Sequence, residues 1–145
     1  MMRNITNNDL PQLEDLDRRC FSPAVRYNRY AIDYYISLPN SIGLTEIKDN
    51  NLIGFIIALV ATKESANIVT VDVDPRFRKQ GIGSRLLQAV MGILKKWKIT
   101  KITLQVSVDN TLAIKFYQKH GFNIMEILPN YYPTTDGYHM ECILG

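Results

Sequence analysis

The chain has 145 residues, of which 46% are hydrophobic and 21% charged, and a net charge of +3 that is too small to demand a nucleic-acid partner. This length suits a single domain, 1–145, that buries about 68–70% of its unfolded surface. The start lacks the apolar segment of a signal peptide and no run reaches the roughly 18 apolar residues of a membrane span, so we expect a cytoplasmic protein without a membrane partner.

The first third of the chain predicts one strand and two helices. Residues 3–6 form the strand, and Asn8 is a natural N-cap for a helix whose apolar face extends to Cys20. Residues 21–27 interrupt this periodicity. A second helix, rich in aromatic residues, follows and ends near Ser37.

The middle of the chain predicts three strands and a helix. Residues 42–48 and 52–61 flank a polar turn, so they form an antiparallel hairpin, and the second strand is apolar on both faces, as in a central strand. Residues 67–73 predict the third strand. An amphipathic helix then covers residues 83–98 and carries lysines near its C-terminus, where the helix dipole favours positive charge.

The last third predicts a strand at residues 102–107, a helix that is N-capped by Asn110 and ended by Gly121, and two strands at residues 122–127 and 138–144. The complete order is strand, two helices, three strands, helix, strand, helix and two strands. We therefore expect an α/β fold with a mixed central sheet of about seven strands and about four helices.

The segment from Arg78 to Ser84, named the phosphate loop here, joins a predicted strand to an amphipathic helix. Free amides at a helix N-terminus point at an anion, and Gly81 and Gly83 let the main chain approach a phosphate closely. Arg78 and Lys79 add positive charge. A dinucleotide, a nucleoside triphosphate and coenzyme A are the competing ligands.

Two of these ligands fit the flanking sequence poorly. A Walker loop needs Gly-Lys-Ser/Thr, whereas Gly83, Ser84 and Arg85 stand here, and a dinucleotide fingerprint needs a third glycine and a later acidic residue. From the loop alone, two glycines that merely turn a strand into a helix remain an equal alternative.

The segment from Val71 to Leu87 resembles the acetyl-CoA signature of the GCN5-related N-acetyltransferase (GNAT) superfamily, whose core is Arg/Gln-x-x-Gly-x-Gly/Ala. The segment from Asn110 to Phe122 is similar to the family's second block, Asn-x-x-Ala-x-x-x-Tyr-x-x-x-Gly-Phe. The two blocks stand in the family's order, and the resemblance spans nearly the whole chain. It implies the GNAT fold, in which splayed strands form the acetyl-CoA cleft.

The resemblance also implies roles for individual residues. The expected cofactor contacts are Val71, Val73, Arg78, Lys79, Gln80, Gly81, Ile82, Gly83, Ser84, Asn110 and Tyr117. Tyr117 would protonate the departing thiolate, because a phenol with a pKa of about 10 suits a basic leaving group. The alternative is that Tyr117 is an ordinary core aromatic of an amphipathic helix.

Within the superfamily, residues 21–28 and 129–132 resemble the two peptide-binding loops of N-terminal acetyltransferases of the RimI, archaeal NatA and NatE types. The resemblance implies transfer of an acetyl group to the α-amine of a protein N-terminus by direct attack in a ternary complex. The expected substrate contacts are Phe21, Pro23, Val25, Tyr27, Tyr131 and Tyr132. Methionine and serine or alanine both remain open as the first substrate residue.

The general base is harder to assign. Gln105 stands where relatives often carry Glu or His, and an amide cannot accept a proton at neutral pH, so we expect it to hold a water relay. Asp72 is a second candidate, with a structural acid as the alternative reading. His120 and His139 are weaker candidates.

Two rival functions remain. One is acetyl transfer to a small amine, although acidic residues are scarce in the two substrate loops. The other is a non-catalytic acyl-CoA-binding subunit. A ribosome or an auxiliary subunit is a possible partner, with Lys95, Lys96, Lys98 and Lys101 as either a basic contact face or a solvated helix end.

We expect no specific nucleic-acid partner and a monomer or weak dimer. Cys20 and Cys142 lack the close spacing of a metal or redox pair, so we expect free thiols and no metal.

Overall fold

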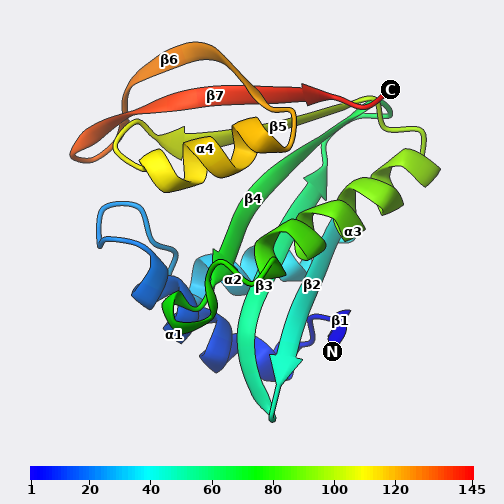
Figure 1. The fold of residues 1–145 in the computed structure, drawn as a ribbon, viewed down its shortest axis with the longest axis vertical. Helices are drawn as coiled ribbons and strands as arrows, with labels where there is room; N and C mark the ends of the chain where they lie inside the picture. The colour runs from blue at the N-terminus through cyan, green and yellow to red at the C-terminus, as the bar shows by residue number, and fades with distance from the viewer.

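A seven-stranded mixed sheet in the order β1-β2-β3-β4-β5-β7-β6 organises the computed structural model, which describes residues 1–145 (Figure 1). The strands are β1 (Met2–Asn4), β2 (Ser41–Lys48), β3 (Asn51–Val60), β4 (Ser65–Val73), β5 (Lys101–Ser107), β6 (Asn123–Tyr132) and β7 (Thr135–Ile143). The helices are α1 (Leu10–Cys20), α2 (Arg29–Ser37), α3 (Ile82–Lys96) and α4 (Thr111–Lys119). The predicted α/β fold with a mixed sheet is confirmed.

Helices cover both faces of the sheet. Figure 1 shows α3 crossing one face of β2, β3 and β4, with α1 and α2 behind the same strands. The β3 strand serves both sides, because Ile56 and Ala58 pack in the core under α3 while Phe55 and Ile57 pack in the core under α1 and α2. This arrangement confirms the expectation that the apolar second strand of the hairpin is central.

The β4 and β5 strands splay apart. They pair in parallel only where Ser65–Ile68 meets Lys101–Leu104, and beyond these residues no pairing joins them. The C-terminal halves of both strands therefore leave their facing edges open, and this opening forms the functional cavity described below.

A β-bulge on β4 changes which side chains face α1. On β3, Ile57 pairs with Thr70 but Ala58 pairs with Ile68, so Val69 has no partner. Opposite residues of an antiparallel pair share a face, so Thr70 lies on the α1 face with Ile57, and Asp72 follows it there. Strict alternation along the sequence would have placed Ile68 and Asp72 on the same face.

The start of the chain differs from the sequence expectation. The first strand covers Met2–Asn4 rather than 3–6, and a 3₁₀ turn at Asn7–Asp9 precedes α1, so Asp9 and not Asn8 is the N-cap residue. The Asp9 carboxylate accepts hydrogen bonds from the Arg3 guanidinium and the Thr6 amide, both at 2.8 Å. These contacts hold the extra turn that sequence periodicity does not reveal.

The last hairpin is longer than the sequence indicates. Pro129–Tyr132, expected to be a loop, lies at the end of β6, and the strands run to Tyr132 and from Thr135. The pairing with β7 shifts register between Leu128 and Tyr132, and Asn130 has a φ of 55°. Because β6 is an edge strand, it tolerates a proline, which has no N–H to donate.

Both cysteines are free thiols, as expected. None of the helices combines the length and the apolar character that crossing a bilayer requires.

Candidate active site

A cavity of about 490 Å³ lies in the opening between β4 and β5. Its walls come from the α1–α2 connection (residues 21–28), β4, the phosphate loop, β5, α4 and the end of β6. Two substrates that enter from opposite sides of the splayed sheet could therefore meet in one space.

Most of the sequence-predicted site residues lie in the wall of this cavity. Those that line it are Val71, Val73, Arg78, Lys79, Gly81, Ile82, Gly83, Ser84, Asn110, Tyr117, Gln105, Phe21, Val25, Tyr27 and Tyr132. The structure does not bring Gln80, Asp72, Pro23 or Tyr131 to the wall.

The N-terminus of α3 presents free amides to the cavity. Gly81 is the N-cap residue with a φ of 80°, a left-handed conformation that favours glycine. The first bond of the helix is donated by the Arg85 amide to the Gly81 carbonyl at 3.0 Å. The amides of the three intervening residues, Ile82, Gly83 and Ser84, therefore have no acceptor within the helix and suit a bound anion.

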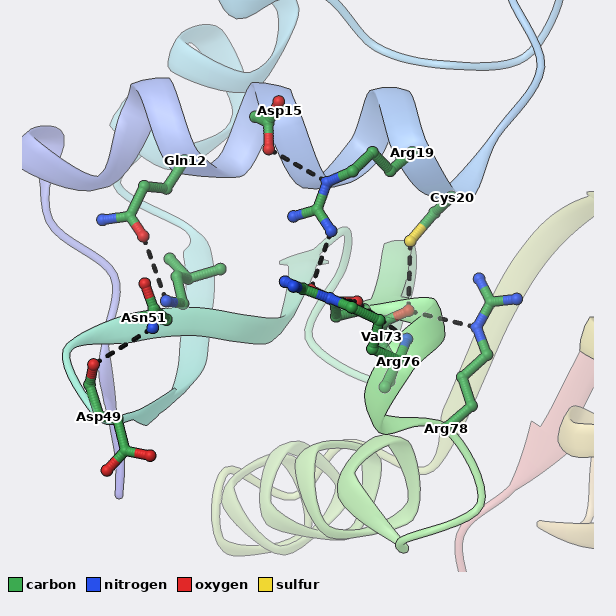
Figure 2. Close-up of polar contacts among 11 residues, drawn as sticks. Gln12, Asp15, Arg19, Cys20, Asp49, Asn51, Val73, Arg76 and Arg78 are labelled. Atoms are coloured by element: carbon green, nitrogen blue, oxygen red, sulfur yellow. Dashed lines mark hydrogen bonds and ion pairs between the residues drawn. The ribbon is translucent and has the colours of Figure 1, made fainter.

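The end of β4 is held by side chains from both flanking segments. Figure 2 shows the Cys20 thiol and the Arg78 guanidinium donating to the Val73 carbonyl, at 3.3 and 3.2 Å. Burial raises the pKa of Cys20 to about 12, so this group stays a neutral thiol. The Arg78 side chain thus lies along the strand end that opens onto the cavity.

Tyr117 lies in the α4 wall. Its ring makes edge-to-face contacts with Phe116 and Phe122, at centroid distances of 5.3 and 5.6 Å. Burial, and then the nearby Asp72 carboxyl, raise the pKa of Tyr117 above its usual value, so the phenol keeps its proton. Asn110 caps the same helix by accepting from the Ala113 amide at 3.2 Å.

Aromatic side chains from the α1–α2 connection and the end of β6 also line the cavity. The Tyr27 hydroxyl donates to the Val69 carbonyl at 3.5 Å, and burial raises the pKa of Tyr132 to about 12. Tyr131 packs edge-to-face on Tyr132 at 4.9 Å but is 51% exposed. Tyr132 therefore borders the cavity and Tyr131 supports it from outside.

Asp72 is enclosed between β4 and α1 and is 1% exposed. One of its oxygens accepts from the Thr70 hydroxyl at 2.5 Å, and the other has only Asp17 beside it. Burial, and then the charge of Asp17, raise the pKa of Asp72 well above its usual value. A carboxyl that holds a proton and lies outside the cavity is poorly suited to be a general base.

Gln105 is the polar group of the β5 wall, and it continues into a chain of hydrogen bonds. Its amide nitrogen lies 3.2 Å from His139 Nδ1, and His139 Nε2 lies 2.9 Å from Glu141 Oε2. The sequence places His139 on the last strand as a weak candidate, and its pairing with Gln105 depends on long-range strand register that the sequence does not show.

Several residues of the wall were not predicted from the sequence. They are Cys20, Val69, Thr70, Phe77, Val106, Ser107, Leu112, Ala113, Phe116 and Lys119. Ala113 belongs to the second family block and could have been named from it, whereas Thr70 lies next to a bulge that a single sequence does not reveal.

A second hollow, open and polar, lies between α1 and the start of β3 (Figure 2). Its buried Asp74 accepts from Arg19 at 2.8 Å and from Arg76 at 2.9 Å. The bond from Arg76 is the main reason why the pKa of Asp74 lies well below its usual range. Asp15 accepts from Arg19 at 3.1 Å, so two arginines and two aspartates balance in charge and tie α1 to the end of β4.

Comparisons with known proteins agree with this geometry. The sequence model of the Acetyltransferase (GNAT) family matches residues 10–122. The "[Ribosomal protein bS18]-alanine N-acetyltransferase" of Escherichia coli strain K12 is 37% identical over 98 residues, which cover 68% of this chain and 66% of the relative. The aligned region thus spans slightly less than two thirds of that relative.

Solved structures show the same fold. The crystal structure of Ard1 from Thermoplasma volcanium has a TM-score of 0.90 and 28% identity, covering 100% of this chain and 97% of that one. Arabidopsis thaliana Naa50, in complex with the bisubstrate analogue CoA-Ac-MVNAL, has a TM-score of 0.80 and 31% identity, covering 97% and 96%. The family match covers most of the chain, and the splayed sheet and the free amides at the start of α3 agree with it, so this protein belongs to the Acetyltransferase (GNAT) family.

Proposed function

We propose that the protein transfers an acetyl group from acetyl-CoA to the α-amino group of a protein or peptide N-terminus. The observation that carries the proposal is a single cavity that extends from the free amides of α3 to the aromatic α1–α2 connection. Such a cavity suits direct attack in a ternary complex. The printed names of the Escherichia coli relative and of the Naa50 complex support an N-terminal acceptor.

In this proposal the amides of Ile82, Gly83 and Ser84 bind the pyrophosphate, with Lys79 as an additional positive charge. The open edge of β4 at Val71 and Val73 pairs with the pantetheine arm. Acetyl-CoA supplies an activated acyl thioester. The acyl end would then lie beside Tyr117 and Gln105, which both line the cavity.

The reacting groups divide the proton transfers between them. The Gln105 amide holds the acceptor amine, or a water that takes its proton, and an α-amine with a pKa of about 7.7–8.0 is already partly neutral. The Tyr117 hydroxyl gives its proton to the departing sulfur. No metal ion is required for either step.

The cavity wall argues against a small polycationic acceptor, because it contains no aspartate or glutamate. A ribosome-bound nascent chain in the cytoplasm, or an auxiliary subunit, remains a partner proposal. Its support is the exposed group of Lys95, Lys96 and Lys98 at the end of α3.

Calorimetry with acetyl-CoA tests the cofactor proposal. Gly83 borders the cavity, and a Cβ there would lie 3.3 Å from the Phe116 ring and 3.4 Å from Val73. We expect Gly83→Val to raise the Kd for acetyl-CoA by about tenfold or more, because the larger side chain overfills this wall. Gly92→Val on the same helix is the matched control, since nothing lies within 4 Å of that position, and its Kd should not change.

Wild-type protein that gives no binding heat with acetyl-CoA would overturn the proposed function. Binding without release of free thiol in the presence of peptides would instead favour a non-catalytic acyl-CoA-binding subunit.

A peptide panel tests the acceptor site. Because Phe21, Val25 and Tyr27 make its wall largely apolar, we expect kcat/KM for a peptide beginning with methionine to exceed that for serine by about tenfold. Phe21→Ala should reduce this preference, whereas Pro23→Ala, in the same connection but outside the wall, should retain it. Equal kcat/KM values for the two peptides would exclude a methionine preference.

A further inference from the structure

A chain of three polar side chains connects the reacting end of the cavity to β7. Gln105 on β5 lies directly opposite His139 on β7, and Glu141 follows two residues later on the same face. The Gln105 amide nitrogen is 3.2 Å from His139 Nδ1, and His139 Nε2 is 2.9 Å from Glu141 Oε2. Only Gln105 borders the cavity.

We propose that His139, held by Glu141, is a positioning residue that fixes which end of the Gln105 amide faces the acceptor amine. The inference rests on the proposed function, because it assigns a role to the wall where acyl transfer takes place. His139 gives the Gln105 amide a defined orientation, which an unrestrained glutamine side chain lacks.

The orientation follows from the hydrogen-bonding capacity of each group. An ionised carboxylate can only accept, so Glu141 requires the proton of a neutral imidazole to be on Nε2. His139 Nδ1 is then an acceptor, and only the NH₂ end of the Gln105 amide can donate to it. The amide oxygen, Oε1, is therefore the end left to face the cavity.

This orientation has a direct use in amine attack. An attacking amine directs its lone pair at the thioester carbon, and its N–H groups need acceptors. Gln105 Oε1 accepts one of these hydrogen bonds and aligns the amine, whereas an NH₂ group in the same place would repel the N–H. A freely rotating amide would present each end part of the time.

Protonation of His139 reverses the arrangement. An imidazolium carries protons on both nitrogens, so Nδ1 then donates, and the amide turns its oxygen toward His139 and its NH₂ toward the cavity. The groups that face His139 are Gln105 on β5, Glu126 on β6 and Glu141 on its own strand, and the two glutamates are the charged ones. A protonated His139 would therefore present the wrong end of the Gln105 amide to the acceptor amine.

Nitrogen-15 NMR of histidine-labelled protein tests the orientation without any substrate. At pH 8 we expect the His139 signal, assigned by its loss in His139→Leu, to show a protonated Nε2 and an unprotonated Nδ1. A proton on Nδ1 of the neutral ring would overturn the inference, because the amide would then face the other way.

Kinetics test the role. His139→Leu should lower kcat by about tenfold, the usual effect of losing one ordering hydrogen bond, with the KM for acetyl-CoA unchanged. His139→Asn places an amide oxygen near the position of Nδ1, where it can accept from the Gln105 NH₂, so we expect kcat within about threefold of wild type. The matched control is Glu126→Gln, which removes a facing carboxylate outside the chain and should change kcat by less than about twofold.

A double-mutant cycle completes the test. If His139 acts through Gln105, adding His139→Leu to Gln105→Ala should cause no further loss of kcat. Additive losses would contradict the inference while leaving the proposed function intact. Wild-type protein that transfers no acetyl group to any peptide would instead contradict the proposed function, and the NMR result would still decide the orientation of the amide.

Discussion

Tyr117→Phe should lower kcat by about 10²- to 10³-fold while leaving the Kd for acetyl-CoA within about twofold. The hydroxyl is the only group removed, and the ring contacts with Phe116 and Phe122 are retained. Burial holds the pKa of Tyr117 above its usual value, so the phenol is protonated throughout the assay range and can supply a proton to the leaving sulfur. The wild-type profile should therefore show no loss of activity from ionisation of this tyrosine below about pH 10.

The measurement is release of free thiol at saturating peptide, together with calorimetry of each variant. An acyl donor with a more acidic thiol needs less protonation of its leaving group, so the defect of Tyr117→Phe should shrink with that donor. Tyr138→Phe, which removes a hydroxyl from a half-buried tyrosine outside the cavity, is the control. A decrease in kcat of less than about threefold in Tyr117→Phe would contradict the catalytic role and favour the alternative that Tyr117 is an ordinary core aromatic.

Local sequence patterns were sufficient for the parts of the fold and site that depend on near neighbours. Asn110 caps α4 and Gly121, with a φ of 93°, follows its end, because capping chemistry is set within a few residues. The glycines and free amides of the phosphate loop were predicted for the same reason. The hairpin formed by β2 and β3 also followed from a short turn between apolar runs.

The remaining parts depend on strand register, which a single sequence does not show. The bulge at Val69 places Asp72 on the face of β4 that packs against α1, where it is buried, and strict alternation along the sequence does not indicate this. The contact between Gln105 and His139 requires the pairing of β5 with β7, across 34 residues of sequence. The extension of β6 through Pro129 likewise depends on its place at the sheet edge.

The buried pair formed by Asp17 and Asp72 should make stability fall with rising pH. Burial raises the pKa of both carboxyls, and the charge of Asp17 raises that of Asp72 further, whereas the hydrogen bond with Asp72 partly lowers that of Asp17. Between the unfolded pKa of about 3.9 and the higher folded pKa, the folded chain holds a proton that the unfolded chain has lost. The stabilising contribution is therefore complete below about pH 4 and is lost as pH rises through the folded pKa.

Asp72→Asn should remove this dependence. An amide is neutral at every pH, and its NH₂ can donate to the Asp17 oxygen that has no other partner. The free energy of unfolding of Asp72→Asn minus that of wild type should increase by about 1.4 kcal/mol for each pH unit in the window between the two pKa values. Denaturant unfolding from pH 5 to 8 measures this difference, in which the effects of the titrating groups outside the Asp17–Asp72 pair cancel.

Asp72→Ala should lower the free energy of unfolding by about 2–4 kcal/mol, because it leaves a cavity and removes the buried partner of Asp17. Asp17 also accepts from the Tyr27 amide at 2.6 Å, so the pair anchors the α1–α2 connection that forms the peptide side of the cavity. Asp33→Asn, on the exposed face of α2, is the control and should track wild type at every pH. If Asp72→Asn and wild type showed parallel pH dependence, no shared proton would be held between α1 and β4, and the connection would have to be anchored by Tyr27 and its neighbours alone.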